Sequence, residues 1–201
     1  MRLAVISEPT LLDGEAEVIG EMLAAGLPLL HLRKPGCTES QMASLIEALP
    51  SSYRDRMVLH DWHRLAVTYG IGGIHLNSRN SNRLFGYSGR YSCSCHSLQE
   101  VALRKGDFDY VFLSPIFDSI SKEGYGSHFT AGTLHKASLE GLIDRRVMAL
   151  GGVRLGNLPL LAKFGFGGAA MLGSVWECFK SCGNRGAVAY LNRCIEVAST
   201  S

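Results

Sequence analysis

Histidines stand at the ends of several short apolar runs in this 201-residue chain. Of its seven histidines, His31, His60, His75 and His96 each close or follow such a run. Imidazole has an ordinary pKa of about 6.5, so it can donate or accept a proton near neutral pH, and its neutral form can bind a metal. A single histidine at such a place is usually structural, whereas four indicate that at least one takes part in chemistry.

Two charged residues and a hydroxyl accompany the histidines. Arg33 carries a planar guanidinium, which can bind a carboxylate or a phosphate through two hydrogen bonds. Asp61 could orient a histidine or contact a metal, and the two charged residues could equally pair with each other. Ser94 places a hydroxyl two residues before His96. These side chains favour an anion-binding site with proton transfer.

Glycine turns near the C-terminus predict a phosphate site. Gly151-Gly152 and Gly173 each follow an apolar strand and precede a helix. Glycine allows backbone N–H groups to approach a phosphate closely, and a helix N-terminus adds partial positive charge. The loop at residues 118–127 contains hydroxyls, a lysine and glycines, a composition typical of a lid over an anion and also of an ordinary solvated loop.

Alternating elements must position these residues. Strands are predicted at residues 2–7, 29–33, 57–61, 73–76, 91–95, 110–114, 146–150 and 168–172, with helices after most of them. Eight such units favour a closed (β/α)8 TIM barrel of the α/β class over an open, flavodoxin-like sheet. No linker interrupts the pattern, so we predict one domain over residues 1–201. Strand carboxyl ends meet at one rim of a barrel, which would bring the histidines together.

Composition limits the partners. The chain has 20 basic and 18 acidic residues without a long basic run, which gives no reason to expect nucleic acid or a membrane surface. No apolar run reaches the roughly 18 to 20 residues of a membrane span, and no signal-peptide pattern is visible. We expect a cytoplasmic protein with a small-molecule ligand.

Motifs along nearly the whole chain are similar to those of one known family. Residues 31–35, His-Leu-Arg-Lys-Pro, are similar to its Gln-x-Arg-x-Lys, and Ser-Cys-His at 94–96 matches its Ser-x-His. The most specific match is Ser-Pro-Ile-Phe-Asp-Ser-Ile-Ser-Lys at 114–122, where the family has Gly-Pro-Ile-Phe-x-Thr-x-Thr-Lys. By these motifs the chain resembles the thiamine phosphate synthase and thiazole tautomerase (TenI-like) superfamily of (β/α)8 barrels.

The resemblance implies roles for individual residues. His96 stands where the tautomerase branch has its catalytic histidine, Arg33 would hold the thiazole carboxylate, and Asp61 completes the catalytic candidates. Candidates for binding substrate or its phosphate groups are His31, His60, Ser94, Ser119, Ser121, Lys122, Gly151, Gly152, Leu172 and Gly173. Of these, the last four would hold the phosphate of a thiazole phosphate, and residues 119–122 would lie near the diphosphate of a second substrate.

The sequence departs from the family pattern around the expected diphosphate. The family's metal-binding Asp after the fourth strand is Asn80 here, and the Asn before Asp61 is His60. The family's lysine on the second strand is Pro35, although Lys34 is adjacent. If Mg²⁺ is bound, Asp61 is the ligand that remains. These changes argue against efficient synthase chemistry, which needs Mg²⁺ and cations to stabilise the leaving diphosphate.

We therefore expect a thiamine-biosynthesis enzyme that acts on a thiazole phosphate, with tautomerase activity preferred because it needs no cofactor. The first alternative is a thiamine phosphate synthase, which couples hydroxymethylpyrimidine diphosphate to thiazole phosphate with Mg²⁺. A non-catalytic sensor of thiazole or thiamine phosphate and a zinc hydrolase using His31, His60, His75 and Asp61 are further hypotheses. A homodimer formed through an exposed helix is also open.

Overall fold

Eight parallel strands close into a barrel in the computed structural model, which describes residues 1–117 and 129–200. The strands are β1 (Arg2–Ile6), β2 (Leu29–Leu32), β3 (Met57–Leu59), β4 (Gly73–Leu76), β5 (Arg90–Cys95), β6 (Tyr110–Leu113), β7 (Val147–Ala149) and β8 (Gly168–Met171). Each strand pairs with the next along the chain, and β8 pairs with β1. The closed order confirms the predicted (β/α)8 barrel and excludes the open sheet.

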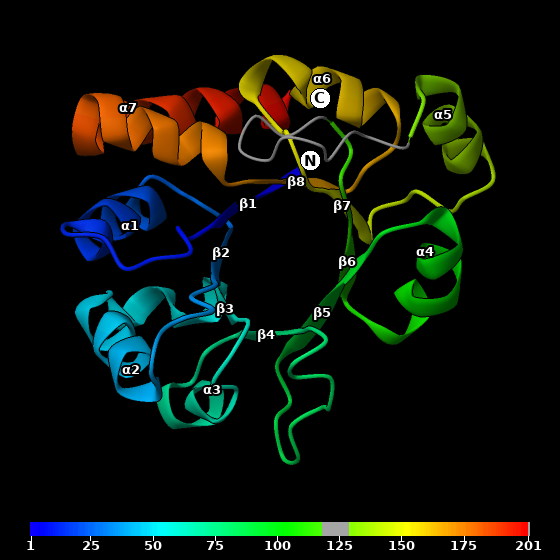
Figure 1. Cartoon of the computed structure of the whole chain (residues 1–201). Helices are drawn as coiled ribbons and strands as arrows, with labels where there is room; N and C mark the ends of the chain where they lie inside the picture. Colours follow the sequence, from blue (N-terminus) through cyan, green and yellow to red (C-terminus); the bar gives the residue numbers. More distant parts are fainter. Residues whose placement is uncertain (118–128, 201) are drawn as a thin grey trace.

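Helices surround this barrel (Figure 1). They are α1 (Glu15–Ala24), α2 (Glu39–Ala48), α3 (Arg64–Tyr69), α4 (Leu98–Arg104), α5 (Ala131–Leu139), α6 (Leu158–Lys163) and α7 (Gly173–Ser199). The segment 77–89 between β4 and β5 has no helix. Across the described ranges, no helix combines the length and the apolarity needed to cross a bilayer.

Local sequence signals explain individual boundaries. A capping box precedes α2: the Gln41 backbone N–H donates to Thr38 Oγ1 at 3.2 Å, and the Thr38 backbone N–H donates to Gln41 Oε1 at 2.9 Å. These two bonds satisfy N–H groups that a helix N-terminus otherwise leaves without partners. The helix therefore begins at Glu39, directly after its cap.

The twofold alternation of side chains along each strand separates two cores. Leu30 and Leu32 belong to the large core that includes residues of the helices, whereas His31 between them contacts the ring of Phe112 inside the barrel. His75, between two outward residues of β4, lies inside as well. The apolar part of the interior is small and consists of Ala4, Ile6, Leu29, Val58, Tyr110, Phe112, Met148 and Ala170. Polar side chains complete it.

Candidate functional site

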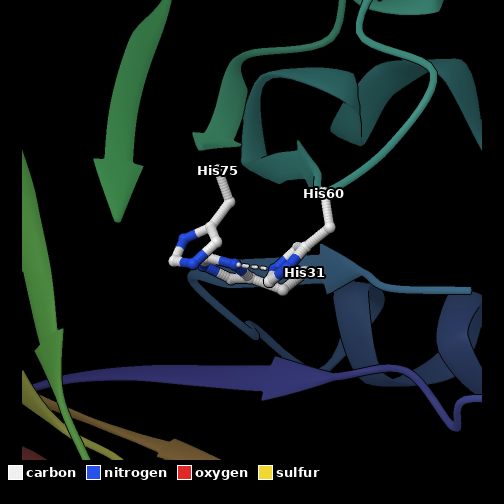
Figure 2. Close-up of side chains that lie close together, drawn as sticks. All are labelled: His31, His60 and His75. Carbon is white, nitrogen blue, oxygen red and sulfur yellow. Dashed lines mark hydrogen bonds between the residues drawn. The ribbon is translucent and has the colours of Figure 1, made fainter. Parts of the chain in front are cut away.

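Three histidines from neighbouring strands converge inside the barrel (Figure 2). His31 lies on β2, His75 on β4, and His60 directly after β3. The ring centroid of His31 is 5.2 Å from that of His60 and 5.7 Å from that of His75, and the last two are 4.2 Å apart. All three side chains are buried. The barrel thus brings together three of the four histidines singled out from the sequence.

Hydrogen bonds link His31 to both of its neighbours in the barrel. Its Nδ1 lies 2.9 Å from Nε2 of His60, and its Nε2 lies 2.8 Å from the hydroxyl of Tyr110, which is on β6. Both nitrogens of the buried ring therefore have partners. Among the residues that the structure describes, the other ring nitrogen of His60, Nδ1, has no hydrogen-bond partner.

His75 is held by two serines of β5. Its Nδ1 lies 2.9 Å from Ser92 Oγ, and its Nε2 lies 3.1 Å from Ser94 Oγ. Ser92 is buried, whereas Ser94 is partly exposed. Ser94, which the sequence indicated as a binding residue, therefore connects the histidine cluster to the outside of the barrel.

These groups are neutral at pH 7. Burial is the main cause that lowers the pKa of His75 to about 3 and the pKa values of His31 and His60 well below 6.5. Burial also raises the pKa of Tyr110 to about 12. Each imidazole therefore carries one N–H and one free lone pair, and the phenol keeps its proton.

The cluster has the residue types of a zinc centre but not its orientation. One nitrogen of each of His31, His60 and His75 lies within 4.8 Å of the others. Zinc binds imidazole along the lone pair in the plane of the ring. The rings of His60 and His75 are stacked with 21° between their planes, so these lone pairs do not meet at one ion unless a ring turns. The arrangement is a hydrogen-bonded network, and it does not support the zinc-hydrolase hypothesis.

Asp61 is held by the loop that follows β4. Arg79 Nη2 lies 3.1 Å and 3.2 Å from the two carboxylate oxygens of Asp61, and Asn80 Nδ2 donates to Oδ1 at 2.8 Å. Asn77 fixes this loop to β3, because its Nδ2 donates to the backbone oxygen of His60 at 2.6 Å. The partner of Asp61 is therefore Arg79 and not Arg33, the partner that the sequence suggested.

The groups around Asp61 do not fit Mg²⁺. This ion requires oxygen ligands at about 2.1 Å in octahedral geometry. Both oxygens of Asp61 face N–H donors, a guanidinium already supplies positive charge, and Asn80 directs its amide nitrogen at the carboxylate. Asp61 as a Mg²⁺ ligand therefore stays a prediction, one that would require Arg79 and Asn80 to turn away from the carboxylate.

Arg33 is partly exposed at the end of β2. Its backbone N–H donates to Ser7 Oγ at 2.9 Å, which fixes the chain where the strand ends. Its positive charge contributes, after burial, to the low pKa values of His60 and His75.

Lys34 faces away from this site into a buried ion pair. Its Nζ lies 2.5 Å from the carboxylate of Glu15 and 2.6 Å from the backbone oxygen of Thr10. Lys34 and Glu15 are only 1% and 2% exposed. Lys34 does not replace the family lysine that Pro35 lacks, because its ammonium group is already paired beside α1.

His96 has a defined tautomer at the end of β5. Its Nδ1 lies 3.0 Å from the backbone oxygen of Ser114, and a carbonyl oxygen can only accept, so Nδ1 carries the proton. Nε2 is then the basic atom of the neutral ring. The backbone N–H of His96 donates to Glu100 at 2.8 Å. This exposed side chain stands apart from the buried cluster and has the form of a general base.

The two predicted glycine turns lie beside each other. Gly151 and Gly152 have φ values of 94° and 62°, and a Cβ on Gly151 would lie 2.8 Å from Cα of Pro115. Helix α7 begins at Gly173, with Leu172 as its N-cap. Ser174 Oγ in the first turn donates to the backbone oxygen of Val153 at 2.9 Å, which ties the second turn to the first. Their binding of a phosphate stays a prediction.

The sequence did not single out every residue of this region. Ser92 and Tyr110 were recognised only as strand residues, although their alternate positions on β5 and β6 turn them inward. Arg79 was not among the candidate site residues. Ser119, Ser121 and Lys122 lie outside the described residues, so their predicted contact with a diphosphate is not tested.

Comparisons with known proteins point to one family. The sequence profile described as thiamine monophosphate synthase (TMP-TENI) matches residues 3–175. A thiamine-phosphate synthase of Photorhabdus laumondii is 27% identical over 166 residues, which cover 78% of this chain and 76% of that protein. Another, from Halalkalibacterium halodurans, is 25% identical over 150 residues, or 70% of each chain.

A solved structure is similar over the full length. A thiamine phosphate pyrophosphorylase from Bacteroides thetaiotaomicron superposes with a TM-score of 0.91 at 37% sequence identity, covering 100% of this chain and 99% of that one. A thiamine phosphate pyrophosphorylase from Pyrococcus furiosus has a TM-score of 0.79 at 19% identity, covering 99% and 96%, and shares the fold.

Proposed function

The chain belongs to the thiamine monophosphate synthase family, and from this premise we propose that it is a thiamine-phosphate synthase, a transferase that joins hydroxymethylpyrimidine diphosphate to a thiazole phosphate. The observation that carries the proposal is the full-length similarity, at 37% identity, to a protein named thiamine phosphate pyrophosphorylase. The names of the relatives favour this activity over the tautomerase that the sequence motifs favoured.

The reaction needs one site for the thiazole phosphate and another for the leaving diphosphate. The carbon–oxygen bond between the pyrimidine methylene and the diphosphate breaks, the diphosphate leaves with the bonding electrons, and the methylene carbon bonds to the thiazole. The turn at Gly151 and Gly152 and the start of α7 would hold the thiazole phosphate. Arg33 and Arg79 supply positive charge at the same rim and would stabilise the leaving diphosphate.

A second candidate, thiazole tautomerase, is favoured by one specific observation. Asp61 is neutralised by Arg79 and Asn80 in place of an oxygen-lined cation site, and a tautomerase needs no metal. His96 would transfer the proton through Nε2, since Nδ1 is fixed on Ser114. Arg33 would then hold the thiazole carboxylate.

Two assays on one preparation test these activities. Coupling of pyrimidine diphosphate to thiazole phosphate and tautomerisation of the thiazole carboxylate phosphate are measured with and without Mg²⁺. The proposal requires coupling at a rate well above that of a chain with His96→Ala and Arg33→Ala. Tautomerisation without coupling would replace it by the second candidate, and tight thiazole phosphate binding without either turnover would favour the sensor. The homodimer stays a prediction for sedimentation analysis.

A further inference from the structure

One side chain organises the turn after β4. Asn77 Nδ2 donates to the backbone oxygen of His60 at 2.6 Å, which ties the turn to the end of β3. Asn77 Oδ1 accepts the backbone N–H groups of Arg79 at 3.0 Å and of Asn80 at 3.1 Å. Backbone bonds of 3.2 Å and 3.1 Å between residues 77 and 80 close the turn. Because an asparagine that bonds the backbone just ahead of it fixes the shape of a turn, Asn77 sets the backbone from which Arg79 and Asn80 extend.

This turn directs Arg79 at Asp61 through one nitrogen only. Nη2 contacts both carboxylate oxygens, and Asn80 Nδ2 contacts one of them. The carboxylate is enclosed, whereas about half of the Arg79 side chain is exposed. Within residues 1–117 and 129–200, Nη1 and Nε of Arg79 have no hydrogen-bond partner. The N–H groups on these two nitrogens are therefore available to a second anion.

The charges of this arrangement match those of a site that holds a divalent ion between two carboxylates. Two carboxylates and one divalent ion have a net charge of zero. Asp61 and Arg79 also have a net charge of zero, and Asn80 contributes an uncharged amide. Arg33 adds a positive charge that acts on His60, the residue to which the turn is tied. The rim therefore needs no ion to offset Asp61 when an anion binds beside it.

We propose that this turn binds the diphosphate group of a substrate without a divalent cation, with Arg79 as the cation and Asn77 as the residue that positions it. Nη1 and Nε of Arg79 donate to the diphosphate oxygens, while Asp61 holds Nη2. The choice of a diphosphate as the ligand rests on the proposed function. When the diphosphate leaves with the bonding electrons, the guanidinium faces the negative charge that it gains.

Arg79 is held in place before any ligand binds. Asn77 fixes its backbone, and Asp61 fixes the end of its side chain. Little side-chain freedom is therefore lost when the diphosphate binds, and such preorganisation increases affinity. A mobile surface arginine would lose more.

Binding of inorganic diphosphate tests the role of Arg79. Calorimetric titration is done once with EDTA and once with excess Mg²⁺. We expect wild type to bind at least as tightly with EDTA as with Mg²⁺, and Arg79→Gln to bind at least about tenfold more weakly than wild type with EDTA. Arg145→Gln removes an exposed guanidinium just before β7 and is the matched control, which should bind as wild type does. Tighter wild-type binding with Mg²⁺, or equal binding by Arg79→Gln and wild type, would overturn the proposal.

A double variant should convert the turn into a site that needs the ion. Arg79→Gln with Asn80→Asp removes the guanidinium and adds a second carboxylate beside Asp61. This variant should bind inorganic diphosphate at least about tenfold more tightly with Mg²⁺ than with EDTA, the reverse of wild type. If it binds with EDTA as tightly as wild type does, Arg79 is not the cation that holds the diphosphate.

A double-mutant cycle tests the positioning role of Asn77. Asn77→Ala should weaken diphosphate binding with EDTA by about tenfold, but should have no further effect in the Arg79→Gln background, because it acts through that side chain. Its affinity for thiazole phosphate should stay within about twofold of wild type, since a separate site would hold that ligand. Asn184→Ala, which removes an amide that bonds Glu21, is the control and should leave both affinities unchanged. Equal losses from Asn77→Ala in both backgrounds would refute the positioning role.

The coupling assay separates failure of this proposal from failure of the proposed function. Coupling that requires Mg²⁺ would support the function and overturn the cation-free site. Absence of coupling, together with Arg79-dependent binding of diphosphate in EDTA, would remove the function and support the site. Coupling at equal rates with EDTA and with Mg²⁺ would support both.

Discussion

Asp61 and Arg79 form an ion pair at the carboxyl rim of the barrel, with Nη2 of Arg79 3.1 Å from Oδ1 of Asp61. The Asp61 side chain is 12% exposed and that of Arg79 is 51% exposed, so the carboxylate is the more enclosed partner. Asn80 completes the contact. The carboxylate oxygens that a divalent ion would need as ligands thus contact a guanidinium and an amide N–H group.

This pair predicts weak binding of Mg²⁺. The wild-type chain should bind the ion only in the millimolar range or above, whereas Arg79→Gln with Asn80→Asp should bind it at least about tenfold more tightly, because two carboxylates then face each other without a guanidinium. Calorimetric titration with Mg²⁺ measures both. Arg79→Gln alone is the control for loss of the cation. Tight binding by the wild type that Asp61→Asn abolishes would contradict this prediction.

The buried histidines predict a fall in stability at mildly acidic pH. Their pKa values are lowered in the folded chain, to about 3 for His75, while the unfolded values stay near 6.5. Below pH 6.5 the unfolded state therefore binds more protons, and the free energy of unfolding decreases by about 1.4 kcal/mol per pH unit for each such histidine. Urea unfolding between pH 7.5 and 5 measures this slope.

A pair of variants separates this effect from other titrations. His75→Gln should have a shallower slope than wild type, since one of the three buried imidazoles is gone. His135→Gln, at an exposed position on α5, should have the wild-type slope. A slope that is the same for both variants would show that the buried histidines do not cause the pH dependence.

The start of α7 predicts where the phosphate binds. Gly173→Asp adds a carboxylate without a clash, because a new Cβ would make only an ordinary contact, at 3.9 Å, with Oε1 of Glu177. It should weaken thiazole phosphate binding by more than about tenfold through charge repulsion, with little loss of stability. Gly106→Asp adds the same charge at an exposed, open position just after the end of α4 and should bind normally. Calorimetry gives both dissociation constants, and equal values would show that the phosphate does not bind at the start of α7.

The buried ion pair of Lys34 and Glu15 should affect the stability of the protein but not its binding of thiazole phosphate. Lys34→Met leaves a carboxylate buried without its partner, which should cost about 3 to 5 kcal/mol in chemical unfolding. Adding Glu15→Leu should restore most of that loss, because the unpaired charge is removed as well. The double variant should bind thiazole phosphate within twofold of wild type. A large loss of binding in this double variant would mean that Lys34 contacts the ligand.

The barrel itself could be predicted from the sequence because its signals are local. Apolar runs alternate with helix patterns, and the Thr38–Gln41 capping box and the glycines at 151 and 152 form within a few residues. Strand boundaries differed by one or two residues, as at β3, which ends at Leu59 while the predicted strand continued to Asp61. The last two residues of the predicted strand, His60 and Asp61, have polar side chains and lie at the carboxyl rim of the barrel.

The partners of the charged and polar residues could not be predicted in this way. Lys34 is adjacent to Arg33 in sequence, yet it bonds Glu15 under α1, while Asp61 bonds Arg79 from the loop after β4. Such choices depend on which side chains the folded loops bring within about 3 Å, a distance that spacing along the chain does not encode.

The sequence by itself determined the eight-stranded barrel, the glycine turns and the gathering of histidines at strand ends, because these follow from hydrophobic periodicity and from backbone freedom at glycine. Only the tertiary structure decided that His31 bonds Tyr110, a residue 79 positions away, and that His75 lies between the hydroxyls of Ser92 and Ser94. The physical reason is closure of the barrel, which sets the register of distant strands and so fixes which inward side chains meet.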